Sequence, residues 1–125
     1  MKKIVVTGGL GFIGSHTVVE LQNAGFDVVI IDNLSNAQES VLEHITKITG
    51  KKPLFEKFDL RDKADVQDFF KRHRDVQGLI HFAASKAVGE SVEKPLLYYE
   101  NNLISLVYLL QELSKLPKAH FIFSS

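Results

Sequence analysis

The sequence predicts an α/β protein built on a doubly wound parallel sheet, and three observations lead to that prediction. Short apolar runs without polar alternation recur along the 125 residues, the pattern of strands covered on both faces. Stretches with apolar residues at helical spacing separate these runs, so strands and helices alternate. Hydrophobic residues make up 45% and charged residues 24%, as in a globular domain. Crossovers between parallel strands are almost always right-handed, which narrows the topology to a Rossmann-like sheet.

The first half of the chain contains three expected strands and two expected helices. The strands are the apolar runs 4–6, 28–31 and 54–58, and a polar residue follows each of them. The helices are 13–24 and 36–48, because apolar residues recur there every three or four positions. The residues expected on the buried faces are Ile13, Thr17, Leu21 and Ala24 in the first helix, and Val41, Ile45 and Ile48 in the second.

The second half continues the alternation with two helices and two strands. Asp62 is expected to cap a helix, which is followed by a strand at 79–82. A long helix is expected over 96–113 and a last strand over 121–123. The expected buried faces are Val66, Phe69 and Phe70 in the shorter helix, and Leu96, Tyr99, Leu103, Leu106 or Val107, Leu110 and Leu113 in the longer one.

Charge and composition exclude several classes of function. Lys plus Arg and Asp plus Glu are both 15, and this zero formal net charge argues against a nucleic-acid partner or a polybasic membrane anchor. The absence of cysteine excludes disulfides, thiolate metal sites and a cysteine nucleophile, and favours a cytoplasmic location. The apolar run near the N-terminus is too short for a signal peptide or a membrane span. No metal site is expected, because no histidine has a partner at metal-ligand spacing, and His81 is interpreted as a packed core residue.

The length suits one domain, which we expect to occupy residues 1–125. The sequence stops just after the apolar run 121–123, whereas a buried strand normally has a neighbour on both sides. We therefore expect a domain that is incomplete at its C-terminal end and belongs to a longer protein.

A glycine-rich turn, residues 7–14, follows the first strand and opens the first helix. It matches G-x-x-G-x-x-G from Gly8 and G-x-G-x-x-G from Gly9, and both patterns end in Gly11 and Gly14. The early glycine permits a tight turn, Gly11 lets a pyrophosphate approach the backbone, and Gly14 lets the helix pack closely. The helix N-terminus then offers N–H groups to the phosphates. A glycine turn without a ligand is the alternative, whereas a P-loop is excluded because Gly-Lys-Ser/Thr is missing.

Asp32 ends the second strand, 18 positions after Gly14. A carboxylate at this place accepts hydrogen bonds from the adenosine ribose hydroxyls of a dinucleotide. It would repel a 2′-phosphate by roughly 4 kcal/mol at contact distance, and no arginine follows closely to offset this. The sequence therefore predicts NAD rather than NADP as the cofactor. The alternative is an aspartate that only caps a turn.

These motifs carry a family resemblance. The glycine turn with Ser15-His16 and the run Asp32-Asn33-Leu34 resemble the extended short-chain dehydrogenase/reductase family. The segments 80–92 (IHFAASKAVGESV) and 94–102 (KPLLYYENN) narrow the resemblance to its nucleotide-sugar 4-epimerases. The resemblance covers the whole chain. It implies a permanently held NAD, interconversion of UDP-glucose and UDP-galactose by transient oxidation at C4, and a homodimer for the full-length protein.

The resemblance also implies which residues contact the cofactor. Lys86 could instead be a solvated loop lysine, and Asn101 an amide bonded within its own helix. The implied contacts are the backbone of Phe12 and Ile13 at the pyrophosphate; Asp32 and Asn33 at the adenosine ribose, with Leu34, Ser35 and Asn36 at the same end; Asp59 and Leu60 at the adenine; Phe82, Ala83 and Ala84 along the cofactor; Lys86 and Asn101 near the nicotinamide end; and Ser124 beside the ring.

The chain departs from the family pattern in two places. Ala84 and Ser85 replace a common Gly-Leu, and the terminal Ser124-Ser125 lacks the third serine that bonds the sugar. The family's catalytic Tyr-x-x-x-Lys does not occur. We therefore expect no catalytic residue, no substrate domain and no activity in this chain alone. A nucleotide-sugar 4,6-dehydratase, another extended short-chain dehydrogenase and a non-catalytic NAD sensor remain alternatives for the parent protein.

Overall fold

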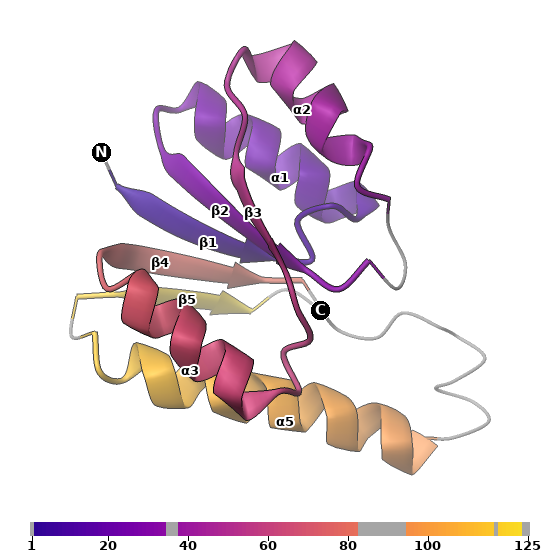
Figure 1. Cartoon of the computed structure of the whole chain (residues 1–125), viewed down its shortest axis with the longest axis vertical. Helices are drawn as coiled ribbons and strands as arrows, with labels where there is room; N and C mark the ends of the chain where they lie inside the picture. The colour runs from indigo at the N-terminus through magenta and orange to yellow at the C-terminus, as the bar shows by residue number, and fades with distance from the viewer. Residues whose placement is uncertain (1, 35–37, 83–94, 117, 124–125) are drawn as a thin grey trace.

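The computed structural model describes residues 2–34, 38–82, 95–116 and 118–123, which form a five-stranded sheet with helices on both faces (Figure 1). All strand pairs are parallel, and the strand order is β3-β2-β1-β4-β5. The chain therefore winds outward from β1 in both directions, which confirms the predicted doubly wound sheet. The strands are β1 (Lys3–Thr7), β2 (Asp27–Asp32), β3 (Leu54–Lys57), β4 (Val76–His81) and β5 (His120–Phe123).

In the described part of the chain, four helices cover the sheet: α1 (Phe12–Asn23), α2 (Val41–Thr49), α3 (Lys63–Arg72) and α5 (Pro95–Leu113). Figure 1 shows α1 and α2 on one face and α3 and α5 on the other. Each face has its own core, because neighbouring strand residues point to opposite sides. Val5 packs in the core under α3 and α5, and Val6 packs in the core under α1 and α2. No helix in the described part of the chain combines the length and apolarity needed to cross a membrane.

The buried face of α1 lies one residue away from the predicted face. Gly14, Val18 and Gln22 are buried, whereas Ile13 is exposed. A Cβ on Gly14 would lie 2.1 Å from the carbonyl oxygen of Gly8. Helix α1 can therefore approach the turn this closely only on the side where Gly14 has no side chain. The buried Gln22 is only half satisfied: its side-chain oxygen accepts a hydrogen bond from the Thr49 hydroxyl at 2.9 Å, whereas its amide nitrogen is buried without a hydrogen-bond partner.

Helix α2 begins at Val41, later than the predicted start at residue 36. Residues 36 and 37 lie outside the described residues, and residues 38–40 form the approach to the helix rather than part of it. Ile45 is buried and Val41 packs against the same core, so the expected face is confirmed at these two residues. It is wrong at Ile48, which is exposed, and Leu42 is buried instead. Gln38, Glu39 and Ser40 precede Val41 and have polar side chains, so an additional helical turn there would bury no apolar surface.

The predicted face of α5 is confirmed at Leu113, which is buried, but is wrong for most of its other described members, and the side chain of Tyr99 lies outside the described residues. Leu103 is 61% exposed, and Leu96, Val107 and Leu110 are exposed with it. Among the described side chains of α5, those that are buried are Ser105, Leu109, Glu112 and Leu113. The small Ser105 allows close approach, and the Glu112 carboxylate accepts a hydrogen bond from Lys115 at 3.0 Å. In α3, by contrast, the prediction is confirmed: the Asp62 side chain caps the helix, and Val66, Phe69 and Phe70 are buried.

Candidate functional site

The described members of the predicted site gather at one edge of the sheet. The glycine turn follows β1, Asp32 ends β2, Asp59 follows β3, and Phe82 follows β4. These strands are adjacent and parallel, so their carboxyl ends meet at the same edge. In open α/β sheets ligands bind at this edge, where the strand order reverses.

The glycine turn has the backbone geometry that its sequence predicts. Gly8 has a φ of 69°, in the left-handed region that favours glycine. Its N–H donates to the carbonyl of Ile31 at 2.7 Å, which fastens the turn to β2. Gly14 faces the Gly8 carbonyl so closely that no side chain fits between them. Gly11 has an ordinary φ of −72°, so its backbone conformation does not require glycine. Its predicted role is instead to leave room for a pyrophosphate beside the backbone.

The N-terminus of α1 opens towards the same edge. No side chain caps the helix at Gly11, and its first turn carries no acidic residue. The N–H groups of Phe12, Ile13 and Gly14 belong to this first turn, where a helix cannot supply their acceptors. The side chains of Phe12 and Ile13 are exposed, and the Phe12 ring lies edge-on against the His16 ring one helical turn later. This arrangement suits an anion that accepts several backbone hydrogen bonds.

Asp32 binds both loops beside it. Its carboxylate is buried, and it accepts the Leu10 N–H at 3.2 Å and the Leu34 N–H at 2.8 Å. Leu34 has a left-handed φ of 63°, a conformation that costs a non-glycine residue energy and that this hydrogen bond helps to hold. The turn-capping interpretation of Asp32 is therefore correct. It does not exclude a ribose contact, because two carboxylate oxygens offer about four acceptor positions.

The Asp59 carboxylate forms an ion pair with the nearby Arg61 guanidinium, whose Nη2 lies 2.6 Å from Oδ2. The Arg61 guanidinium lowers the pKa of Asp59, and a hydrogen bond from the Asn33 side chain lowers it further. Asn33 and Asp59 are therefore in contact, while their contacts with the ribose and the adenine stay predictions. Leu60 is buried in the core between the sheet and α3, so only its main chain is available to a ligand.

Thr7 and His81 form a buried link between the ends of β1 and β4. The Thr7 Oγ1 lies 2.6 Å from His81 Nδ1 and accepts the Phe82 N–H at 3.0 Å. Burial lowers the pKa of His81 to about 4, so the imidazole is neutral near neutral pH. The prediction of a packed core histidine is confirmed. Its partner was not predicted, although Thr7 and His81 are the last residues of their strands and lie in register.

The remaining predicted contacts cannot be placed. Asn101 lies within α5, but its side chain is outside the part of the structure that is described. The other residues of this kind are Ser35, Asn36, Ala83, Ala84, Lys86 and Ser124, all outside the described residues.

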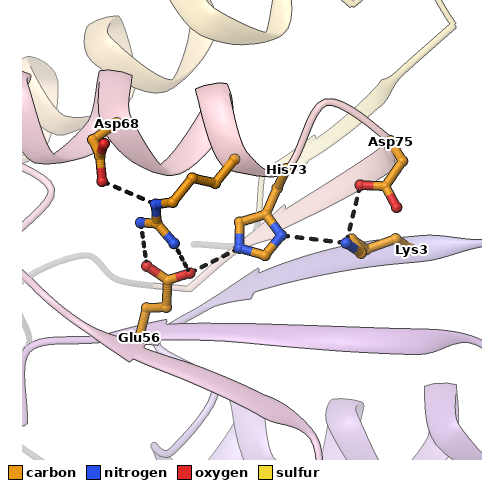
Figure 2. Close-up of polar contacts among 6 residues, drawn as sticks. Lys3, Glu56, Asp68, His73 and Asp75 are labelled. Atoms are coloured by element: carbon orange, nitrogen blue, oxygen red, sulfur yellow. Dashed lines mark hydrogen bonds and ion pairs between the residues drawn. The ribbon is translucent and has the colours of Figure 1, made fainter.

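A second polar cluster lies on the α3 side of the sheet (Figure 2). His73 bridges two elements, because its Nε2 lies 2.8 Å from Glu56 of β3 and its Nδ1 lies 3.2 Å from Lys3 of β1. Arg72 binds Glu56 through both terminal nitrogens and lowers the pKa of that carboxyl group. Lys3 also pairs with Asp75 at 3.0 Å. These contacts connect β1, β3 and the end of α3, which indicates a structural role. Across the described ranges, no three metal-ligating side chains form a group that could hold an ion.

Comparisons with known proteins agree with this geometry. Residues 4–125 match the model of the NAD dependent epimerase/dehydratase family. The chain is 51% identical to UDP-glucose 4-epimerase of Pasteurella multocida over 122 residues, covering 98% of this chain and 36% of the relative. It is 49% identical to the Haemophilus influenzae enzyme of the same name, with the same coverage. The chain thus spans little more than a third of the length of these relatives.

Solved structures show the same fold. The UDP-glucose 4-epimerase of Bifidobacterium longum, in complex with NAD+ and UDP, superposes with a TM-score of 0.91 at 44% identity, over 99% of this chain and 37% of that one. The enzyme from Stenotrophomonas maltophila, with bound NAD and formylated UDP-arabinopyranose, gives a TM-score of 0.90 at 41% identity, over 100% and 37%. The predicted fold class and family resemblance are therefore confirmed.

Proposed function

The chain belongs to the NAD dependent epimerase/dehydratase family, and we propose that it is the NAD-binding part of a UDP-glucose 4-epimerase. One observation carries the proposal: the uncapped N-terminus of α1 lies at the same sheet edge as the buried Asp32 carboxylate. Backbone N–H donors that can bind an anion thus lie at the same edge as a carboxylate that can accept hydrogen bonds from hydroxyl groups. The pyrophosphate and the ribose of a dinucleotide require this combination. The relatives named above favour the epimerase over the dehydratase and sensor alternatives.

The described residues would hold the two charged and polar parts of NAD. The N–H groups of Phe12 and Ile13 donate to the pyrophosphate oxygens, and close packing at Gly14 keeps these groups at the turn. Asp32 accepts from the ribose hydroxyls while it retains Leu10 and Leu34, and its negative charge disfavours NADP. When bound, the nicotinamide supplies a reversible hydride acceptor for C4 of a UDP-hexose. Tyr-x-x-x-Lys is missing from the sequence, so we propose that another part of the parent protein supplies the acid and base.

Calorimetric titration of this chain with NAD and NADP tests the proposal. We expect NAD to bind and NADP to bind at least about tenfold more weakly, a difference of about 1.4 kcal/mol. Gly11→Val should abolish binding, because the new side chain occupies the space beside the turn, whereas Ala24→Val, on the exposed end of the same helix, should bind as the wild type does. A folded wild-type chain that binds neither dinucleotide refutes the proposal.

We also propose that the parent protein is a cytoplasmic homodimer that uses α5 as part of its interface. Leu96, Leu103, Val107 and Leu110 are exposed, and their spacing of seven, four and three residues places them along one side of the helix. An apolar stripe of this kind suits a self-complementary contact between two copies.

A further inference from the structure

A hollow of about 420 Å³ lies between α1 and α2, the two helices that share one face of the sheet (Figure 1). The helices are tied together near their C-terminal ends, where the Thr49 hydroxyl donates to the Gln22 side-chain oxygen at 2.9 Å. From there the hollow extends towards their N-terminal ends, over a floor that includes the buried Leu10 and Ile45. A volume of this size falls within the range of small-molecule sites.

Two aromatic rings form one wall of the hollow. Phe12 is 81% exposed, and the centroid of its ring lies 4.9 Å from that of the His16 ring, with the two planes at 73°. The rings therefore form a corner, in which a flat molecule can stack on one ring and meet the edge of the other. Ile48 lines the hollow from α2 and is 67% exposed, so a ligand there would also remove aliphatic surface from water.

The polar side chains of the hollow are all of a kind that can both donate and accept hydrogen bonds. They are two serines, a glutamine and two histidines, namely Ser15, His16, Gln38, Ser40 and His44. Among the described residues that line the hollow there is no aspartate, glutamate, lysine or arginine. Such a lining favours an uncharged ligand, because an ion would lose hydration there without gaining an opposite charge.

We propose that this hollow binds a flat, uncharged heteroaromatic molecule that carries hydrogen-bond donors and acceptors on its edge. The face of the molecule stacks in the corner between Phe12 and His16, and its edge bonds to His44 on the α2 side. The site is distinct from the proposed pyrophosphate contact, which uses the main-chain N–H of Phe12 and not its ring. The inference therefore does not rest on the proposed NAD function.

NMR titration of the isotope-labelled chain with 7-azaindole tests the proposal. This probe is flat and uncharged near neutral pH, and it has one donor and one acceptor on the same edge. We expect a dissociation constant of about 1 mM or lower, and amide shift changes confined to the glycine turn, α1 and α2. Indole has the same shape but lacks the ring acceptor, so it should bind about fivefold more weakly, the effect of one hydrogen bond.

Two variants each remove one part of the site. Phe12→Ala removes the stacking wall and His44→Ala removes the polar partner on α2, so each should weaken 7-azaindole binding about fivefold. Both side chains are exposed, so the chain should stay folded, with a urea midpoint close to that of the wild type. The matched controls are Leu54→Ala and His120→Ala, which change exposed residues outside the hollow and should bind the probe as the wild type does.

Three results would overturn the proposal. The first is a folded wild type whose spectrum does not change with 7-azaindole, or changes away from α1 and α2. The second is binding by Phe12→Ala and His44→Ala that is as tight as binding by the two controls. The third is displacement of 7-azaindole by saturating NAD, because the probe would then occupy the cofactor site. A wild type that binds 7-azaindole but not NAD would support this inference and refute only the proposed function.

Discussion

At the scale of single residues, Asp32 serves the fold and the proposed cofactor site with the same carboxylate. Asp32→Ala leaves the N–H groups of Leu10 and Leu34 without this acceptor, so the free energy of unfolding should fall by about 1–3 kcal/mol. NAD affinity should fall as well, because the ribose loses its acceptor. Urea titration measures the first effect and calorimetry the second.

Asp27→Ala is the control for this prediction. Asp27 begins the same strand, but it is only half-buried and pairs with Lys51, so its loss should change stability by less than about 1 kcal/mol and leave NAD binding intact. If Asp32→Ala binds NAD as tightly as Asp27→Ala, the ribose role of Asp32 is wrong.

His81 should make the stability of the chain depend on pH. The pKa of His81 is about 4 in the folded chain, against an ordinary value of 6.5 for an exposed histidine. Between these two pH values the unfolded chain therefore binds a proton at His81 that the folded chain does not bind. The free energy of unfolding therefore falls as the pH drops through this window. From about pH 7 to about pH 5 the loss from this residue should be roughly 2 kcal/mol. Urea titrations at the two pH values measure it.

Two substitutions isolate this contribution from other titrating groups. His81→Leu and His81→Asn both remove the imidazole, and His81→Asn keeps an acceptor near Thr7. Either variant should lose roughly 2 kcal/mol less than the wild type between the two pH values. An identical loss in wild type and variants would show that His81 does not titrate as its burial requires.

At the scale of elements, the sequence predicted strands better than helix faces. The strands were clear because both of their sides are apolar, as Val5 and Val6 show. The faces of α1 and α5 were misassigned because apolar residues occur on more than one side, and the buried side includes Gly14, Gln22 and Glu112. Burial of these residues depends on close approach or on a hydrogen-bond partner, and neither is visible in apolar spacing.

The candidate site also has parts that the sequence predicts and parts that it does not. The glycine turn and Asp32 could be located because special backbone needs and strand ends leave a mark in the sequence. The pairing of Thr7 with His81, and of Asp59 with Arg61, could not be predicted in this way. These contacts depend on the register of neighbouring strands and on side-chain rotamers.

Close packing at the start of α1 gives a prediction for the element as a whole. Gly14→Ala places a Cβ 2.1 Å from the Gly8 carbonyl oxygen, a contact that the backbone can relieve only by moving helix and turn apart. Unfolding free energy should fall by about 2–3 kcal/mol, and NAD binding should weaken because the first helical turn shifts. Ser15→Ala, the next position on α1, is the control and should have the smaller effect in both urea and calorimetric titrations. Equal effects would show that α1 tolerates displacement at Gly14.

At the scale of the whole molecule, the distribution of exposed apolar side chains bears on assembly. Phe12 and Ile48 are exposed on the α1 and α2 side, whereas Leu103 and Leu110 belong to a stripe along α5. A stripe on one helix can meet its own symmetry mate, with each copy presenting the same surface. Phe12 and Ile48 instead line a hollow between α1 and α2, so they do not form a stripe along one helix.

The α5 stripe therefore predicts concentration-dependent self-association, which sedimentation velocity measures. The double variant Leu103→Glu/Leu110→Glu should shift the chain to monomer, because it places charges in the centre of the apolar contact. Its stability as a monomer should change little, since both side chains are already exposed. Ile48→Glu, an equally drastic change at an exposed position of α2, should associate as the wild type does. A wild type that stays monomeric at high concentration, or a double variant that still associates like the wild type, would rule out α5 as the interface.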